Sequence, residues 1–320
     1  MRKNEHTDVK QGKSKKVYLK LNVDIRSMEY SEWTASPAVF IKHCERNHPI
    51  VSGNKWYKLK YNVEMAQRKG LELIITFGGA WSNHIHATAY YSKENGLKSI
   101  GIIRGERPPQ LSQTLQDAES WGMQLEFVTR EAYREKHTED FKMWLMAEYG
   151  PAHIIPEGGA NYLGVNGCME MLEEEDAMYD VICCAAGTGT MAAGLALRLK
   201  PHQKLIVFSS LKGGFMREQV QNHLMYFLMD KEATEDVMKG IVFMDEYHFG
   251  GYARHTQELV DYILGKKEEK GWWLDQVYTG KMMWGIDDLV KKGFFTPDQK
   301  ILAIHSGGLQ GLRSLEINGA

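Results

Sequence analysis

This sequence of 320 residues has few cysteines, no long apolar run and nearly balanced positive and negative charge. The four cysteines are Cys44, Cys168, Cys183 and Cys184. They show no metal-ligand spacing, and the adjacent pair lies in an apolar stretch, which is typical of buried free thiols. We therefore expect no metal site and a reducing, cytoplasmic setting.

The formal net charge of −2 argues against a nucleic-acid or membrane-surface binder, which would show a basic face or tract. No segment reaches the roughly 18 consecutive apolar residues of a membrane span, and the N-terminus lacks the apolar core of a secretory signal. The basic cluster Lys10–Lys16 is expected to belong to a mobile, solvated leader. We therefore expect neither a nucleic-acid nor a membrane partner.

Short apolar segments rich in β-branched residues alternate with amphipathic helical patterns, which predicts an α/β protein with parallel sheets covered on both faces. Strands are expected at Glu72–Phe77, Lys98–Arg104, Leu125–Thr129, Tyr179–Ala186, Lys204–Ser210, Gly240–Met244 and Lys300–Ser306. Helices are expected at Trp56–Arg68, Asn83–Asn95, Met191–Leu199 and His255–Lys267. So many strands indicate two α/β domains.

Glycine-rich turns join strand to helix in several places, where ligands collect in such folds. These segments are Thr76–Ala89, Cys184–Leu195, His305–Leu312 and, after a shorter strand, Asp275–Val290. In the second, Gly187 and Gly189 allow close backbone approach, and Thr188 and Thr190 add hydroxyl donors. This loop suits a phosphate group, and a tight turn without a ligand is the alternative.

Other candidate residues are ambiguous when taken singly. Ser82 and Asn83 begin an expected helix, where they can cap it or help to bind a carboxylate. Tyr278 and Tyr252 could face a ligand or simply be packed aromatic side chains. Lys55 could be a reactive amine or an ordinary solvated lysine.

The order of these segments resembles the pyridoxal-phosphate-dependent family that contains 1-aminocyclopropane-1-carboxylate (ACC) deaminase and D-cysteine desulfhydrase. The segments are "SGNKWYKLKYN", "TFGGAWSNH", "IIPEGGANYLGVNG", "GTGT", "YHFGGYAR" and "DQVYTGKMMWG". The resemblance implies the tryptophan-synthase-β fold (fold type II), with a small amino acid as substrate and a homodimer as the usual assembly. It also implies a large cofactor domain from residues 1–57 and 162–320, with a smaller α/β domain, 58–161, inserted in it.

By this resemblance Lys55 matches the lysine that forms a Schiff base with pyridoxal phosphate, and Lys58 matches one that helps to hold its phosphate. The phosphate loop corresponds to Gly187, Thr188, Gly189 and Thr190. Asn83 matches the asparagine beside the ring hydroxyl, and Thr279 falls at the residue that touches the pyridine nitrogen.

The resemblance also assigns substrate contacts. Ser82 matches the serine that exchanges a proton with the substrate, and Tyr278 and Tyr252 match two tyrosines facing it. The backbone N–H groups of Ser82, Asn83 and His84 would receive the substrate carboxylate.

The residue at position 279 favours one reaction. ACC deaminases have a glutamate there, which keeps the pyridine nitrogen protonated, whereas the hydroxyl of Thr279 supplies no counter-charge. D-Cysteine has an α-hydrogen and a good leaving group, so its elimination tolerates a weaker electron sink. We therefore expect α,β-elimination from D-cysteine to pyruvate, ammonia and sulfide.

Three alternatives stay open: ACC ring opening to 2-oxobutanoate and ammonia, a nucleotide-binding α/β protein, and a cofactor-binding protein without turnover. The sequence also departs from the family pattern at Trp81, Cys168, Met191 and the stretch Ile41–Pro49. None of these departures removes a cofactor residue, but they leave the substrate open.

Overall fold

The computed structural model describes residues 29–314, so the basic cluster at Lys10–Lys16 lies outside the described residues. Its larger sheet has the strand order β1-β2-β10-β7-β8-β9. These strands are β1 (Tyr30–Ala35), β2 (Ala38–Lys42), β10 (Lys300–Ile304), β7 (Val181–Ala186), β8 (Lys204–Ser209) and β9 (Ile241–Met244). All neighbours pair in parallel except β1 and β2, which are antiparallel.

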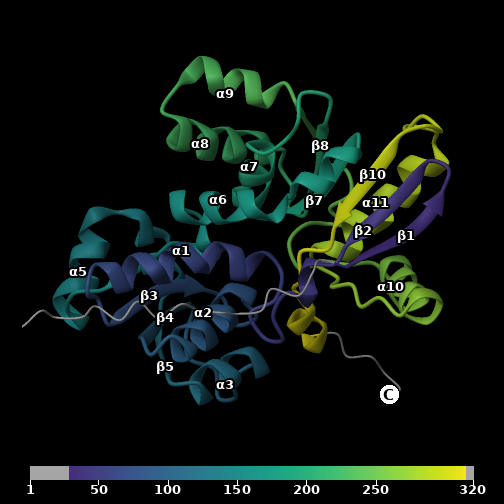
Figure 1. Cartoon of the computed structure of the whole chain (residues 1–320). Coiled ribbons are helices and arrows are strands. Elements are labelled where there is room, and N and C mark those ends of the chain that lie inside the picture. Colours follow the sequence, from purple (N-terminus) through teal and green to yellow (C-terminus); the bar gives the residue numbers. More distant parts are fainter. Residues whose placement is uncertain (1–28, 315–320) are drawn as a thin grey trace, which may run out of the picture.

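The smaller sheet is wholly parallel, with the order β5-β4-β3-β6. Its strands are β3 (Leu73–Gly78), β4 (Lys98–Arg104), β5 (Met123–Val128) and β6 (His153–Ile155). Figure 1 shows the two sheets in separate parts of the molecule, with α1 (Asn54–Arg68) between the smaller sheet and α6 (Tyr162–Cys168). The two predicted α/β sheets are therefore present.

Alternating side chains of the larger sheet enter two different cores. Along β7, Ile182 and Cys184 pack with the cluster of α1, α6, α7 (Thr190–Ala196) and α8 (Met216–Leu228). Val181 and Cys183 pack with α10 (Gln257–Lys270) and α11 (Thr279–Lys291) on the other face. This two-sided burial explains why the strand is continuously apolar.

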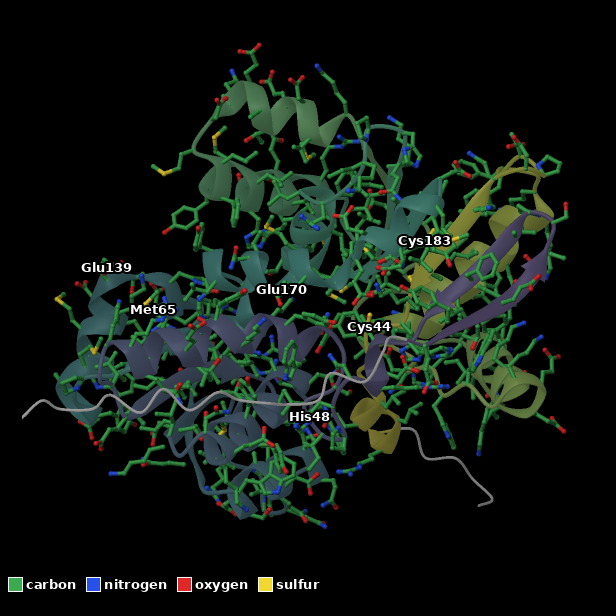
Figure 2. The ribbon with its side chains drawn as sticks, viewed as in Figure 1. Cys44, His48, Met65, Glu139, Glu170 and Cys183 are labelled. Carbon is green, nitrogen blue, oxygen red and sulfur yellow. The ribbon has the colours of Figure 1, made fainter. Side chains whose placement is uncertain are left out.

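The smaller sheet is covered in the same way. Its first face packs against α4 (Arg130–Arg134) and α5 (Glu139–Tyr149). Its second face packs against α2 (Asn83–Glu94) and α3 (Gln113–Ser120). Figure 2 shows Glu139 on α5 and Cys183 within the larger sheet. All four cysteines are buried free thiols, as predicted.

Two sequence expectations are corrected. The larger sheet is mixed because the segments β1 and β2, which were not predicted, form a hairpin at its edge. No strand precedes Tyr278, because the carboxylate of Asp275 folds that segment into a turn. The short strand β6 was also not predicted. The helix α9 (Lys231–Met238) follows α8 and belongs to the same layer.

Within residues 29–314, no helix is both long and apolar enough to cross a membrane. All strands of the smaller sheet lie between residues 58 and 161, and all those of the larger sheet lie outside that range. The domain boundaries themselves stay a prediction, and α1 runs across the first of them.

Candidate active site

A cavity of about 650 Å³ lies beside the N-terminus of α1, within the range of about 300–1,000 Å³ common for small-molecule sites. Lys55, Asn83, Gly308 and Gln310 line it together with charged residues such as Glu45. Ser82, the phosphate loop and the two tyrosines do not border this cavity. The structure therefore brings Lys55 and Asn83 to one space.

The start of α1 is held tightly against the end of β10. Gly53 has a φ of +64°, and a Cβ atom there would lie 2.0 Å from the carbonyl oxygen of Ser306. The same oxygen accepts a hydrogen bond of 3.0 Å from Asn54 N–H. Only glycine fits, which places Lys55 at a fixed point beside the cavity.

The amine of Lys55 is suited to nucleophilic chemistry. Desolvation by burial, and then the positive charge of Lys58, hold the pKa of Lys55 well below its usual value. A lysine with a depressed pKa presents the neutral amine that attacks a carbonyl group. Lys55 is therefore not an ordinary solvated lysine.

Lys58 lies one helical turn further on and is buried, with 3% of its surface exposed. Its Nζ donates to the carbonyl oxygen of Gly158 at 3.2 Å and to Thr188 Oγ1 at 3.4 Å. Burial lowers the pKa of Lys58 too. The ammonium group therefore lies where the glycine loop before α6 meets the predicted phosphate loop.

The predicted phosphate loop is pre-formed. Gly189 has a φ of +74° and begins α7 without a side-chain cap, so the first N–H groups of the helix stay available to an anion. The hydroxyls of Thr188 and Thr190 lie 2.9 Å apart. His223, which no sequence motif singled out, contacts the Thr188 carbonyl oxygen at 2.8 Å and stabilises the turn.

Ser82 is both a helix cap and an available donor. Its Oγ accepts from Ile85 N–H at 3.2 Å at the start of α2, which leaves the hydroxyl hydrogen free to be donated. The Ser82 N–H already donates to Gly79 O at 3.0 Å. Of the three N–H groups predicted to receive a carboxylate, only those of Asn83 and His84 are therefore unengaged within the described backbone.

His84 is buried next to this cap, and its Nε2 lies 2.9 Å from Thr76 Oγ1. Its Nδ1 is buried and has no hydrogen-bond partner within the described part of the chain. Desolvation, followed by the charges of Lys55 and Lys58, holds the pKa of His84 well below its usual value. The ring is therefore neutral and can pair Nδ1 with a ligand group.

Tyr278 lies against the phosphate loop, since a Cβ atom on Gly187 would be 2.8 Å from the Tyr278 ring. Its ring centroid is 6.4 Å from that of Tyr252, which lies in the loop between β9 and α10. Burial raises the pKa of Tyr278 well above its usual value, with Tyr252 and Asp275 adding to the effect. The two predicted tyrosines are therefore neighbours, and Tyr278 stays protonated.

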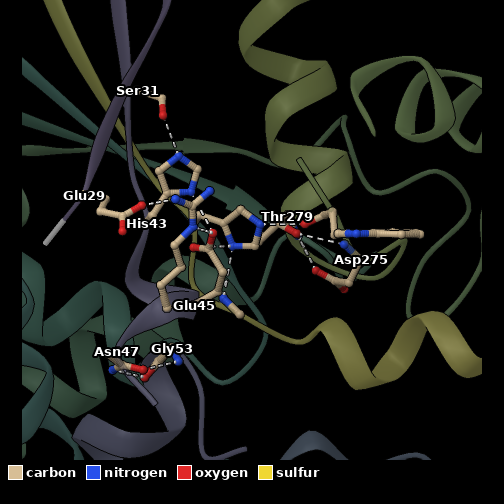
Figure 3. A network of polar contacts seen from close by, with 12 residues as sticks. Glu29, Ser31, His43, Glu45, Asn47, Gly53, Asp275 and Thr279 are labelled. Carbon is tan, nitrogen blue, oxygen red and sulfur yellow. Dashed lines mark hydrogen bonds and ion pairs between the residues drawn. The ribbon is translucent and has the colours of Figure 1, made fainter. Parts of the chain in front are cut away.

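Thr279 is fully buried, and its hydroxyl donates to Asp275 Oδ1 at 2.6 Å (Figure 3). The same hydroxyl accepts from Asp275 N–H at 3.1 Å. A contact between Thr279 and the pyridine nitrogen stays a prediction, and the burial of Thr279 does not favour it. Asp275 is a residue that sequence reasoning missed, although aspartate side chains commonly accept from the backbone N–H two residues on and so form turns.

The unusual stretch Ile41–Pro49 supplies a polar network whose central residue, Glu45, borders the cavity. Glu45 lies between His43, at 2.7 Å, and His305, at 3.2 Å, and Figure 3 shows the contact of His43 with Ser31. His305 in turn contacts Trp273 O at 2.7 Å. The network fixes the end of β10, next to the residues that hold α1.

The other departures have different environments. Met191 is buried, and its sulfur accepts a 3.5 Å contact from Asn54 Nδ2 beside Lys55. Cys168 packs against Gly194, and Trp81 is 43% exposed. Among residues 29–314, no cluster of three or more His, Cys, Asp or Glu side chains could hold a metal ion.

A family model described as "Pyridoxal-phosphate dependent enzyme" matches residues 25–307. The chain belongs to this family. Its cofactor is pyridoxal phosphate, and the protein is an enzyme. The alternative of a nucleotide-binding protein is thereby set aside.

Several relatives are similar over most of their length. A putative ACC deaminase of Pyrococcus horikoshii is 31% identical over 280 residues, covering 85% of each chain. A D-cysteine desulfhydrase of Serratia proteamaculans is 26% identical over 291 residues, covering 86% of this chain and 87% of the relative. The crystal structure of an ACC deaminase homologue, 26% identical, superimposes with a TM-score of 0.75 over 90% of this chain and 91% of the other. These relatives support a deaminating lyase.

The residues present fit the cofactor. A lysine amine with a depressed pKa lies beside a cavity of suitable size, and one helical turn further on a second buried lysine lies against a glycine–threonine loop with no capping side chain. The unpaired Nδ1 of His84 adds a polar group in need of a ligand. These features match an aldehyde-bearing phosphate ester.

Proposed function

We propose that the protein catalyses α,β-elimination from D-cysteine, releasing pyruvate, ammonia and sulfide. The observation that carries the proposal is the corner at Asp275–Thr279, where the Asp275 carboxylate is engaged by the N–H groups of Val277, Tyr278 and Thr279 and by the Thr279 hydroxyl, and where residue 279 itself carries no carboxylate. The site thus presents no free carboxylate at this corner. Such a site suits a substrate with an α-hydrogen and a good leaving group.

The chemistry that pyridoxal phosphate supplies when bound is electron withdrawal from the α-carbon of the amino acid. Lys55 would bind the cofactor through its amine, whose pKa burial lowers, and Lys58, Thr188 and the loop N–H groups would hold its phosphate. Asn83 would lie beside the ring hydroxyl. These roles rest on the match to the family and on the positions described above.

Ser82 and the two tyrosines would handle the substrate. The Ser82 hydroxyl keeps its hydrogen available while it caps α2, so it can exchange a proton with the substrate. Tyr278, whose pKa burial raises, stays protonated at neutral pH and can donate toward a departing thiolate. The N–H groups of Asn83 and His84 would receive the substrate carboxylate.

ACC ring opening is the second candidate, favoured by the 31% identity to putative ACC deaminases of Pyrococcus horikoshii and Thermotoga maritima. The two reactions are separated by offering D-cysteine and ACC in parallel to the purified protein and measuring keto acid and sulfide. We expect pyruvate and sulfide from D-cysteine only. Production of 2-oxobutanoate from ACC would establish the second candidate, and inactivity with both would contradict both.

The cofactor lysine is tested separately. Lys55→Ala should abolish the visible absorption band of the bound cofactor, because it removes the amine that binds it. Lys60→Ala is the matched control, since this lysine of the same helix pairs with Glu170 at 2.5 Å, away from the site. An unchanged band in Lys55→Ala would contradict the assignment.

We also propose a homodimer in the cytoplasm. The four cysteines are buried free thiols, which supports a reducing compartment. The dimer rests on the habit of the family, and sedimentation of the purified protein tests it.

A further inference from the structure

Three side chains from separate parts of the chain form a line of hydrogen bonds that ends at Asn83. Thr114, in the first turn of α3, is fully buried, and its Oγ1 donates to Gln310 Oε1 at 2.9 Å. Gln310 belongs to the short helix η6 (Leu309–Ser314), which follows β10. Its Nε2 donates to Asn83 Oδ1. The line therefore starts at α3 beside the smaller sheet, passes through η6 after the last strand of the larger sheet, and ends at α2 beside the smaller sheet.

The helix η6 is held in this place by further contacts. Arg313 forms an ion pair with Asp117 of α3, close to Thr114. On the other side, Gln276 Nε2 donates to Gly311 O at 3.1 Å, which joins η6 to the turn before α11. Gln310 is thus anchored from both sheets, and its side chain has a fixed direction toward Asn83.

The line also fixes which way the Asn83 amide points. An amide oxygen only accepts hydrogen bonds and an amide nitrogen only donates them. A Cβ atom on Gly308 would be 3.1 Å from Asn83 Nδ2 and 3.4 Å from Asp275 Oδ1, so both atoms lie on one side of Gly308. A nitrogen next to that carboxylate is favourable, whereas an oxygen would be repelled.

The nitrogen is consequently the free end of the amide. Asn83 Oδ1 is occupied by Gln310, whereas Nδ2 donates to no protein atom within residues 29–314. Asn83, Gly308, Gln310 and Lys55 all border the same cavity. The free amide donor therefore belongs to a residue that borders the same cavity as the cofactor lysine, and it lies next to Gly308, which borders that cavity too.

We propose that Gln310 is a positioning residue that holds Asn83 with its amide nitrogen toward the ring hydroxyl oxygen of pyridoxal phosphate. The proposal rests on the proposed function, which places Asn83 beside that hydroxyl. A hydrogen-bond donor at this oxygen stabilises its anionic form and lowers the pH at which the bound cofactor loses its proton. Gln310 thereby acts on the cofactor without touching it.

Gln310→Glu tests whether the hydrogen bond that Gln310 donates to Asn83 sets the orientation of the Asn83 amide. A carboxylate accepts from Thr114 but cannot donate to Asn83, so the Asn83 amide turns its oxygen toward the cofactor. The readout is a pH titration of the visible absorption of the cofactor-loaded protein, without substrate. We expect the midpoint to rise by about one pH unit, the effect of losing one hydrogen bond to a charged group.

The matched control is Gln116→Glu, which makes the same change at an exposed position of α3 where the side chain caps only Leu111 O. Thr114→Val is a second test variant, which frees the Gln310 amide to rotate and should raise the midpoint by less. It preserves the test if Gln310→Glu does not fold. Midpoints in both variants equal to that of Gln116→Glu would overturn the proposal.

The outcome is distinguishable from failure of the proposed function. If D-cysteine is not a substrate but the visible titration still shifts in Gln310→Glu, the positioning role holds and only the reaction is wrong. If the wild-type protein binds the cofactor and the titration is insensitive to both variants, only the positioning role fails. A wild-type protein with no visible absorption would overturn both.

Discussion

The loops that lead into α7 and α11 meet where Gly187 lies against the Tyr278 ring, and the two helix N-termini are satisfied in opposite ways. At α11, the Asp275 carboxylate accepts from the N–H groups of Val277, Tyr278 and Thr279 at 2.8–2.9 Å. At α7, Gly189 offers no side chain, and the loop instead has the Lys58 ammonium near it. A helix start that already holds a carboxylate cannot also hold a phosphate.

This difference gives the two helix N-termini different roles. The start of α7 is left for an external anion, whereas the internal anion at α11 makes a rigid corner that carries Tyr278. Gly187 joins the two, because its Cα packs directly against the Tyr278 ring. Three variants test this division.

The largest effect is expected from Asp275→Ala. It removes an acceptor from three backbone N–H groups and one hydroxyl in a buried corner, which should lower the free energy of unfolding by about 3 kcal/mol. Asp230→Ala is the matched control, since Asp230 caps the exposed start of α9 with one bond of 3.0 Å and should cost about 1 kcal/mol. Equal losses in urea unfolding would contradict the special role of the α11 corner.

A smaller effect is expected from Gly187→Ala. The added methyl group would lie 2.8 Å from the Tyr278 ring, so the ring must move, at a cost of about 1–3 kcal/mol and with weaker cofactor binding. Gly265→Ala in α10 has no atom within 4 Å of its added methyl and should be neutral or slightly stabilising. Unaltered cofactor affinity in Gly187→Ala, measured by fluorescence titration, would argue that the two helix starts are independent.

A third, pH-dependent effect concerns Lys281 of α11, whose Nζ donates to His248 O at 2.8 Å and Gly251 O at 2.9 Å and so holds the loop of Tyr252. Burial lowers its pKa to about 8 from the ordinary 10.5, against the attraction of Asp275. Between these values the unfolded chain binds more protons than the folded one, so the free energy of unfolding should rise with pH.

Lys281→Met lacks this group, and the other titrating groups cancel in the comparison. The stability of the wild type relative to Lys281→Met should therefore increase between pH 8 and pH 10.5. Urea unfolding of both proteins across this window gives the difference. A difference that stays constant with pH would show that Lys281 keeps its ordinary pKa.

Much of the fold could be predicted because its signals are local. The strand at Lys98–Arg104 was predicted with its observed bounds, since a strand buried on both faces is a continuous apolar run. The helix at Ser82 has the capping residue that the sequence indicated. The strand β1 was missed because an edge strand whose side chains are mostly exposed or half-buried lacks such a run.

The sequence by itself determined the order of strands and helices, the glycine loops and the lysine behind Ser-Gly-Asn, because each depends on neighbouring residues. Tertiary structure decided the rest. Lys58 meets Thr188 across 130 positions, Thr114 meets Gln310 across 196, and the Lys55 pKa depends on its burial and on the charge of Lys58. The orientation of the Asn83 amide and the pKa of the Lys55 amine are set by groups distant in sequence, so they are determined only once the chain has folded.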